Sequence, residues 1–271
     1  MFTLLARKFM LKAARKSDEM LEPYEWKRSR TVLREESGGN TADLLDYAPL
    51  VRALGGEVIE ISATSQNHIN AMDMTKEYGE INPIIEKSQF LQSLCEQIIA
   101  GHTFTKGQQS IIDRCTESVY RYYLQGDYQG VPPTLQDFRE ELLKQPEPEA
   151  HALALELELF TKGSLNTFAQ QTNVDTDKRL ICYDIMELGE QLRPIGMLII
   201  LDNILNRITA NRRKGRQTFV YVDEIYLLFQ YEYSAQFLFK LWKRVRKYGA
   251  FCTGITQDVE VRPDRALYKV A

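Results

Sequence analysis

The stretch Phe219-Val220-Tyr221-Val222, followed by the carboxylates Asp223 and Glu224, decides the predicted fold. Aromatic and β-branched residues without a charge are typical of a strand buried on both faces of a parallel sheet. Around this stretch, apolar runs typical of strands alternate with longer runs of helical periodicity. After Gly163 we expect a strand at 180–185, a helix at 194–213, a strand at 218–223, a helix at 234–247 and a strand at 251–255. This alternation predicts a parallel α/β sheet with right-handed crossovers, flanked by helices.

The rest of the chain divides into further predicted parts. The first sixteen residues contain Lys and Arg but no Asp or Glu, which predicts a basic amphipathic helix that packs on its own domain, frays, or lies on a membrane surface. A strand is expected at 57–62, and helices are expected from Ser88 to Phe160, one of them capped by Thr134 and Asp137. The predicted organisation is an unmatched N-terminal segment at 1–45, a first part of the α/β domain at 46–87, an all-helical insert at 88–160 and a second part of the α/β domain at 161–271.

The composition is that of an ordinary globular chain. Its 271 residues are 44% hydrophobic, and 34 Lys and Arg against 37 Asp and Glu give a formal charge of -3. This charge argues against a surface built throughout for nucleic acid. Four widely spaced cysteines form no zinc-binding pattern, which indicates a reducing, cytoplasmic setting. The longest apolar stretch, 194–201, is far below the ~20 residues that span a bilayer, so any membrane association is expected to be peripheral.

The carboxylates at the end of the 219–222 strand are the first candidates for chemistry. Ligands of parallel sheets bind beyond the carboxyl ends of the strands. At that place Asp223 would hold Mg²⁺ through water, and Glu224 would polarise the water that attacks a γ-phosphate. The alternative interpretation, a strand end that meets solvent and caps the next turn, stays open. Gln257 follows the next strand, where its amide would reach the same phosphate and water.

The loop that normally cradles phosphates is missing from this sequence. No Gly-x-x-x-x-Gly-Lys-Ser/Thr pattern occurs, and Lys162-Gly163-Ser164 has the wrong order. That loop supplies several backbone N–H donors and a lysine. The sequence therefore predicts half of a site for ATP and Mg²⁺.

A basic helix is expected between the last two strands. Residues 240–247 contain five Lys or Arg beside Trp242. Arg244 and Arg246 are candidates for contacts to phosphate or DNA, because a guanidinium has the fork geometry that phosphate requires. A solvated helix face, whose last-turn cations complement the helix dipole, explains the same charges.

Several motifs resemble, as an ordered set, the conjugal-transfer ATPases of type IV secretion systems, the TraE/TrsE-like, VirB-type motors. The matching segments are Asp46-Tyr47-Ala48-Pro49-Leu50-Val51, Leu54-Gly55-Gly56-Glu57-Val58-Ile59, residues 62–70, Ile112-Asp113-Arg114-Cys115, residues 145–150, residues 162–166, Gln171-Thr172-Asn173-Val174, residues 184–189, Asp223-Glu224, Trp242-Lys243-Arg244 and Thr253-Gly254-Ile255-Thr256-Gln257. The resemblance covers about residues 46–258.

This resemblance implies a RecA-like ATPase domain with a helical insert, working as a hexameric motor at the inner face of the cell membrane. Such a motor energises DNA or protein transfer and the assembly of a pilus or channel with other secretion subunits. Asp223 and Glu224 match the family's acidic pair, and Gln257 matches its glutamine motif. The family's phosphate loop has no counterpart in residues 1–45, and residues 262–265 depart from the family pattern.

We therefore expect an internal fragment, incomplete at both ends, that hydrolyses ATP poorly or not at all by itself. The alternative is a non-catalytic interaction module that binds motor or channel subunits through its helical insert. A DNA-binding module that uses residues 240–247 is a third hypothesis.

Overall fold

The computed structural model describes residues 8–14, 47–79, 82–99, 104–185, 187–189, 191–223, 225, 229 and 232–255. In β1 and in parts of α9 and η3 the description covers the backbone alone. Among the helices so described, none combines the length and the apolar character that a membrane crossing requires.

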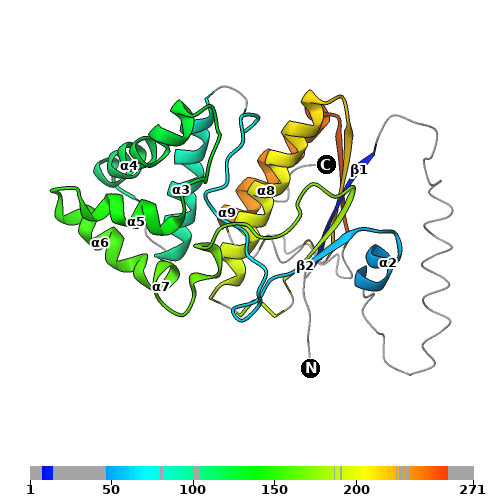
Figure 1. Cartoon of the computed structure of the whole chain (residues 1–271), viewed down its shortest axis with the longest axis horizontal. Coiled ribbons are helices and arrows are strands. Elements are labelled where there is room, and N and C mark those ends of the chain that lie inside the picture. The colour runs from blue at the N-terminus through cyan, green and yellow to red at the C-terminus, as the bar shows by residue number, and fades with distance from the viewer. Residues whose placement is uncertain are drawn as a thin grey trace, which may run out of the picture.

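A five-stranded sheet forms the centre of the molecule (Figure 1). Its strands, in spatial order, are β2 (Glu57–Glu60), β3 (Leu180–Asp184), β1 (Lys8–Ala14), β4 (Gln217–Val222) and β5 (Ala250–Gly254). β2 runs parallel to β3, and β4 runs parallel to β5, whereas β1 is antiparallel to both β3 and β4. The four strands other than β1 therefore share one direction, and their carboxyl ends meet at one edge of the sheet.

The structure of β1 contradicts two predictions. The helix expected in the first sixteen residues is wrong for Lys8–Ala14, and the sheet is mixed rather than wholly parallel. The gap between β3 and β4 offers backbone hydrogen-bond partners on both sides. Because strand formation depends more on such pairing than on local preference, the helical pattern is overridden. The linker predicted at 17–45 lies outside the described residues.

Helices cover both faces of the sheet (Figure 1). One face packs on α8 (Arg193–Arg213) and α9 (Glu232–Val245), which is followed by the 3₁₀ turn η3 (Arg246–Tyr248). The other face carries the short helix α2 (Tyr47–Ala53). Side chains alternate between these faces, since Tyr183 and Val220 belong to the main core, whereas Leu180 and Cys182 pack with α2.

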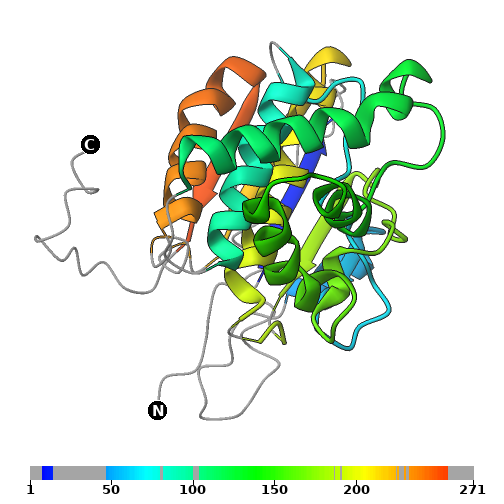
Figure 2. The same ribbon diagram turned by 90° about the vertical axis from the view of Figure 1, so that its left-hand side faces the viewer.

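The insert predicted at 88–160 falls within a group of helices on the far side of α8 from the sheet (Figures 1 and 2). Its elements are α3 (Pro83–Ile98), α4 (Lys106–Gln125), α5 (Leu135–Leu143), α6 (Pro148–Glu156) and α7 (Glu158–Thr161), followed by the 3₁₀ turn η1 (Asn166–Phe168). We call α3–α7 the helical unit. The predicted capping box of Thr134 and Asp137 is confirmed at the start of α5, and Thr105 with Gln108 forms a second one at α4.

Helix α8 approaches its neighbours most closely at Gly196. A Cβ atom at this position would lie 2.3 Å from Leu188 Cδ2 and 2.9 Å from Phe168 Cζ. Both neighbours are buried in the main core, so neither can move far. The missing side chain therefore lets α8 pack against the segments that hold Leu188 and Phe168.

We expect Gly196→Ala to destabilise the protein by about 1–3 kcal/mol, because the added methyl overpacks a filled core. Gly107→Ala is the matched control, since a Cβ there would lie 3.8 Å from Thr105 Oγ1, and alanine favours the helix. Urea unfolding of both variants measures the difference. A stability of Gly196→Ala equal to that of Gly107→Ala would contradict the close packing.

Candidate functional site

Two carboxylates lie at the carboxyl edge of the sheet. Asp184 is the last residue of β3, and Asp223 directly follows β4. Both are half-buried. Two strand spacings, roughly 10 Å, separate β3 from β4, because β1 lies between them. The register places Lys8 opposite Asp184 and Phe9 opposite Val222, so the backbone of Lys8 lies between the two acidic positions.

The chain segments that follow β4 and β5 are held side by side. The Ile255 N–H donates to Val222 O at 2.8 Å, and the Ile225 N–H donates to Ile255 O at 3.0 Å. The adjacency expected for these two strand ends is thus present. Glu224 and Gln257 themselves lie outside the described residues, so their predicted roles stay predictions.

The basic segment lies on α9 and η3, as its helical pattern predicts. Arg244 is in α9 and Arg246 is in η3, but their side chains lie outside the description. The Lys243 ammonium lies 4.1 Å from the centre of the exposed Phe239 ring. The proposed phosphate or DNA contacts of the two arginines stay predictions.

Of the three residues predicted to act on Mg²⁺ and the attacking water, only Asp223 has a described side chain. A carboxylate such as Asp223 is a ligand type that Mg²⁺ accepts, and Mg²⁺ often keeps several waters and takes only one or two carboxylates. In the part of the chain that the structure describes, no cluster of three or more His, Cys, Asp or Glu could hold a metal ion.

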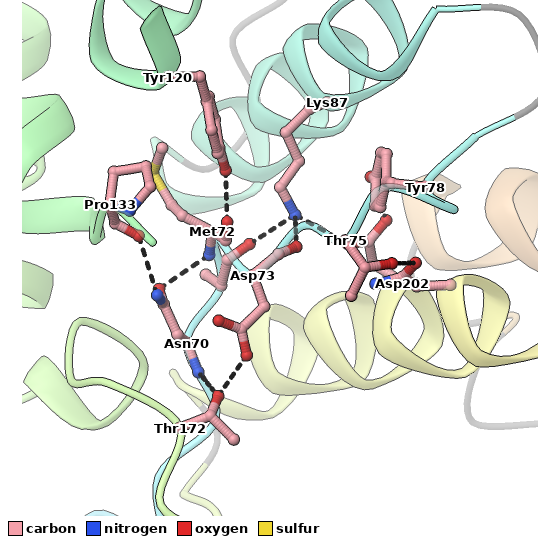
Figure 3. A network of polar contacts seen from close by, with 12 residues as sticks. Asn70, Met72, Asp73, Thr75, Tyr78, Lys87, Tyr120, Pro133, Thr172 and Asp202 are labelled. Carbon is pink, nitrogen blue, oxygen red and sulfur yellow. Dashed lines mark hydrogen bonds and ion pairs between the residues drawn. The ribbon is translucent and has the colours of Figure 1, made fainter. Parts of the chain in front are cut away.

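A second polar site lies between α8 and the helical unit (Figure 3). Residues 70–78, which we call the strap, belong to the segment that leads from β2 to α3. Four consecutive strap carbonyls each accept a hydrogen bond from a side chain of the helical unit. Lys87 Nζ donates to Ala71 O and Asp73 O, Tyr120 donates to Met72 O, and Tyr123 donates to Met74 O. The strap is thereby fixed without belonging to a helix or a strand.

Lys87 is the centre of this network. It is fully buried, and its ammonium forms an ion pair of 3.0 Å with Asp202 Oδ2 on α8. The Tyr78 hydroxyl donates to the other oxygen, Asp202 Oδ1, at 2.6 Å. The rings of Tyr78 and Phe90 lie 4.8 Å and 4.6 Å from the ammonium. Burial, together with the carboxylate of Asp202, raises the pKa of Tyr78 well above its ordinary value. Through the ion pair with Asp202 and the two strap carbonyls, Lys87 connects α3, α8 and the strap.

Two further contacts fix the strap, one to the segment after η1 and one to the loop between α4 and α5. Thr172 donates to the Asp73 carboxylate, and Asn70 Nδ2 donates to Pro133 O at 2.9 Å. Burial raises the pKa of the Asp73 carboxyl above its ordinary value, against the opposing effects of Thr172 and Lys87.

Sequence reasoning missed this network. One signal was present, because Lys87 lies three, four and seven residues before Phe90, Leu91 and Leu94 on the apolar face of α3.

A pocket of about 80 Å³ opens beside the network, between α3, α8 and η3. Its wall combines the aromatic rings of Tyr78 and Tyr248 with polar groups of Gln89, Asn206 and Thr209. The volume is sufficient for several water molecules.

The fold defined by these elements is consistent with an α/β nucleotide-hydrolase-like fold. Among solved structures the chain is similar to VirB4 of Thermoanaerobacter pseudethanolicus, with a TM-score of 0.63 and 23% sequence identity over 78% of this chain. The match spans 59% of the VirB4 chain. No family model and no curated protein matches the sequence. At this identity the likeness supports the resemblance to secretion ATPases at the level of the fold.

We expect Lys87→Met to destabilise the protein by about 3–5 kcal/mol, because it leaves the Asp202 carboxylate buried without its cation. The double variant Lys87→Met/Asp202→Asn should recover part of this loss, since Asn removes the uncompensated charge and keeps an acceptor for Tyr78. Urea unfolding provides the comparison. Lys144→Met is the control, because its pair with Glu141 involves a lysine that is largely exposed, and such pairs contribute about 0–1 kcal/mol.

We expect Asp73→Asn to raise the thermal midpoint at pH 7. A carboxyl whose pKa is raised on folding destabilises the folded state at every pH above that raised pKa, because its charge is buried. The advantage of the variant should shrink as the pH falls through the raised pKa and vanish below the ordinary value near 4. Thermal unfolding across this pH range checks the sign, and a constant difference at all pH values would refute the assignment.

Proposed function

We propose that this chain is an ATPase-type motor domain of a conjugative type IV secretion system that does not hydrolyse ATP by itself. The VirB4-like fold carries the proposal. The position of Asp223 at the carboxyl end of β4 agrees with it, because this edge is where ligands of such sheets bind. The ordered motifs of residues 46–258 support the same class.

The predicted inactivity follows from the missing phosphate contacts. A phosphate-binding loop and its lysine follow the carboxyl end of a strand and lead into a helix. β1 is a central strand, but it runs antiparallel to its neighbours, so its own carboxyl end points to the opposite edge of the sheet. Each lost charge-assisted contact weakens binding by about 1.5–3 kcal/mol. ATP affinity would therefore be lower by orders of magnitude than in a complete site.

In this proposal the acidic pair and the glutamine act only when phosphate contacts come from another subunit. Asp223 would hold Mg²⁺ through water, Glu224 would accept a proton from the attacking water, and Gln257 would orient that water. Bound Mg²⁺ would neutralise phosphate charge. The partners would be other secretion subunits at the inner face of the cell membrane, including further copies in a hexamer. Arg244 and Arg246 would contact phosphate or DNA.

A second candidate function is a non-catalytic module that binds motor or channel subunits through the helical unit. Large apolar side chains that remain in contact with solvent favour it. Leu155 on α6 and Leu159 on α7, one helical turn apart, are 69% and 44% exposed. Exposed apolar surface that forms a contiguous patch marks sites of protein–protein contact.

Thermal unfolding with and without Mg²⁺-ATP tests the first proposal. A ligand present at about 100 times its dissociation constant stabilises a protein by about 2.7 kcal/mol. We expect no shift at millimolar nucleotide and no turnover for the folded chain alone. ATP hydrolysis at the rate of a complete motor domain, abolished by Glu224→Gln, would refute the predicted inactivity.

A further inference from the structure

Helices α6 and α7 are apolar on two opposite faces. They follow each other with one residue between them, and their inner face is buried in the core through Ala150, Leu153, Ala154 and Leu157. On the outer face Ala152, Leu155 and Leu159 are exposed, and we call these three residues the outer stripe. Their spacing of three and four residues places them along one side of a helix.

The outer stripe is unusual for a helix that already packs on a core. A surface helix needs one apolar stripe, and its opposite face is typically polar. Single exposed leucines are ordinary. Two exposed leucines and an alanine in line are different, since they form the kind of ridge that a second helix packs against. Leu155 and Leu159 are 69% and 44% exposed, so a partner helix has apolar surface to cover.

The charged residues of α6 and α7 themselves are all acidic. Residues 145–161 contain four glutamates and no lysine or arginine. Over residues 104–163 there are ten Asp and Glu against six Lys and Arg, a formal charge of -4, whereas the whole chain has -3. Glu149 and Glu156 lie seven residues apart along one flank of the stripe, and within the described part of the chain neither forms an ion pair. By contrast, Glu147 pairs with Arg114, and Glu158 pairs with Arg139.

We propose that the outer stripe is a docking surface for a basic amphipathic helix of a partner protein. The apolar residues of that helix would cover Leu155 and Leu159, and its Lys or Arg side chains would meet Glu149 and Glu156. The local charge decides between occupants. A second copy of this chain docked stripe to stripe would bring like charges together, and an anionic membrane surface would repel the glutamates. A cationic helix satisfies both the apolar and the acidic part of the surface.

This inference deepens the second candidate function and rests on it, but it does not require nucleotide binding. The thermal unfolding test with Mg²⁺-ATP concerns the carboxyl edge of the sheet alone. Peptide binding to the helical unit is a separate measurement. The proposed motor function and the proposed docking surface can therefore fail independently of each other.

The test uses the full chain and a fluorescent amphipathic helix of about 14 Leu and Lys residues, with a scrambled peptide of the same composition as a probe control. Fluorescence anisotropy should show that Leu155→Ser/Leu159→Ser weakens binding at least tenfold. Tyr122→Ser, which removes an exposed ring on α4, should leave binding unchanged. Glu149→Gln/Glu156→Gln should weaken binding and reduce its dependence on salt. Because all of these side chains are exposed, the thermal midpoints of the variants should match that of the unchanged chain.

Three outcomes would overturn the proposal. The first is equal peptide affinity of the unchanged chain and Leu155→Ser/Leu159→Ser, with both folded. The second is a dimer in light scattering that Leu155→Ser/Leu159→Ser abolishes, which would make a second copy the occupant. The third is binding to vesicles, anionic or neutral, that depends on the same two leucines, which would make the occupant a membrane surface.

Discussion

A lysine without contact to water sets the strongest constraint on this molecule. Removing the Lys87 ammonium from water is unfavourable unless charge and hydrogen bonds replace its hydration. Asp202, two strap carbonyls and two aromatic rings together provide that replacement. These groups come from α8, the strap and α3, so the ammonium can be accommodated only when all three are in place. The position of the helical unit on α8 therefore depends on this one charge.

The later part of the sheet was predictable because its signals are local and periodic. The strand expected at 218–223 is β4 at Gln217–Val222, and the helix expected at 194–213 is α8 at Arg193–Arg213. Alternating burial and helical spacing act within a window of about ten residues, which a sequence displays directly. β1 was not predictable, since its strand state depends on partners at 180–184 and 217–222 that no local window contains.

The candidate site likewise has a part that the sequence predicts and a part that it does not. The carboxyl edge follows from the order of strands, and the described structure places Asp223 and the adjoining ends of β4 and β5 there. The strap network could not be predicted in detail, because its main acceptors are backbone carbonyls, and every residue has one. A sequence identifies a lysine on an apolar helix face, but it does not identify the carbonyls that will surround it. The acidic surface of α6 and α7 is predictable only in part. Composition reveals its charge, whereas only the fold reveals which of its leucines remain exposed.

The place of β1 between β3 and β4 has a consequence for biosynthesis. β1 ends at Ala14, and its first partner strand begins at Leu180, so 165 residues separate them. At a translation rate of about 5–20 residues per second, the partner emerges on the order of 10–30 s after β1. During that interval the backbone groups that later join two halves of the sheet have no strand to pair with. Unpaired backbone N–H and C=O groups of this kind are a template for pairing with other chains, so the interval favours off-pathway association of the nascent chain.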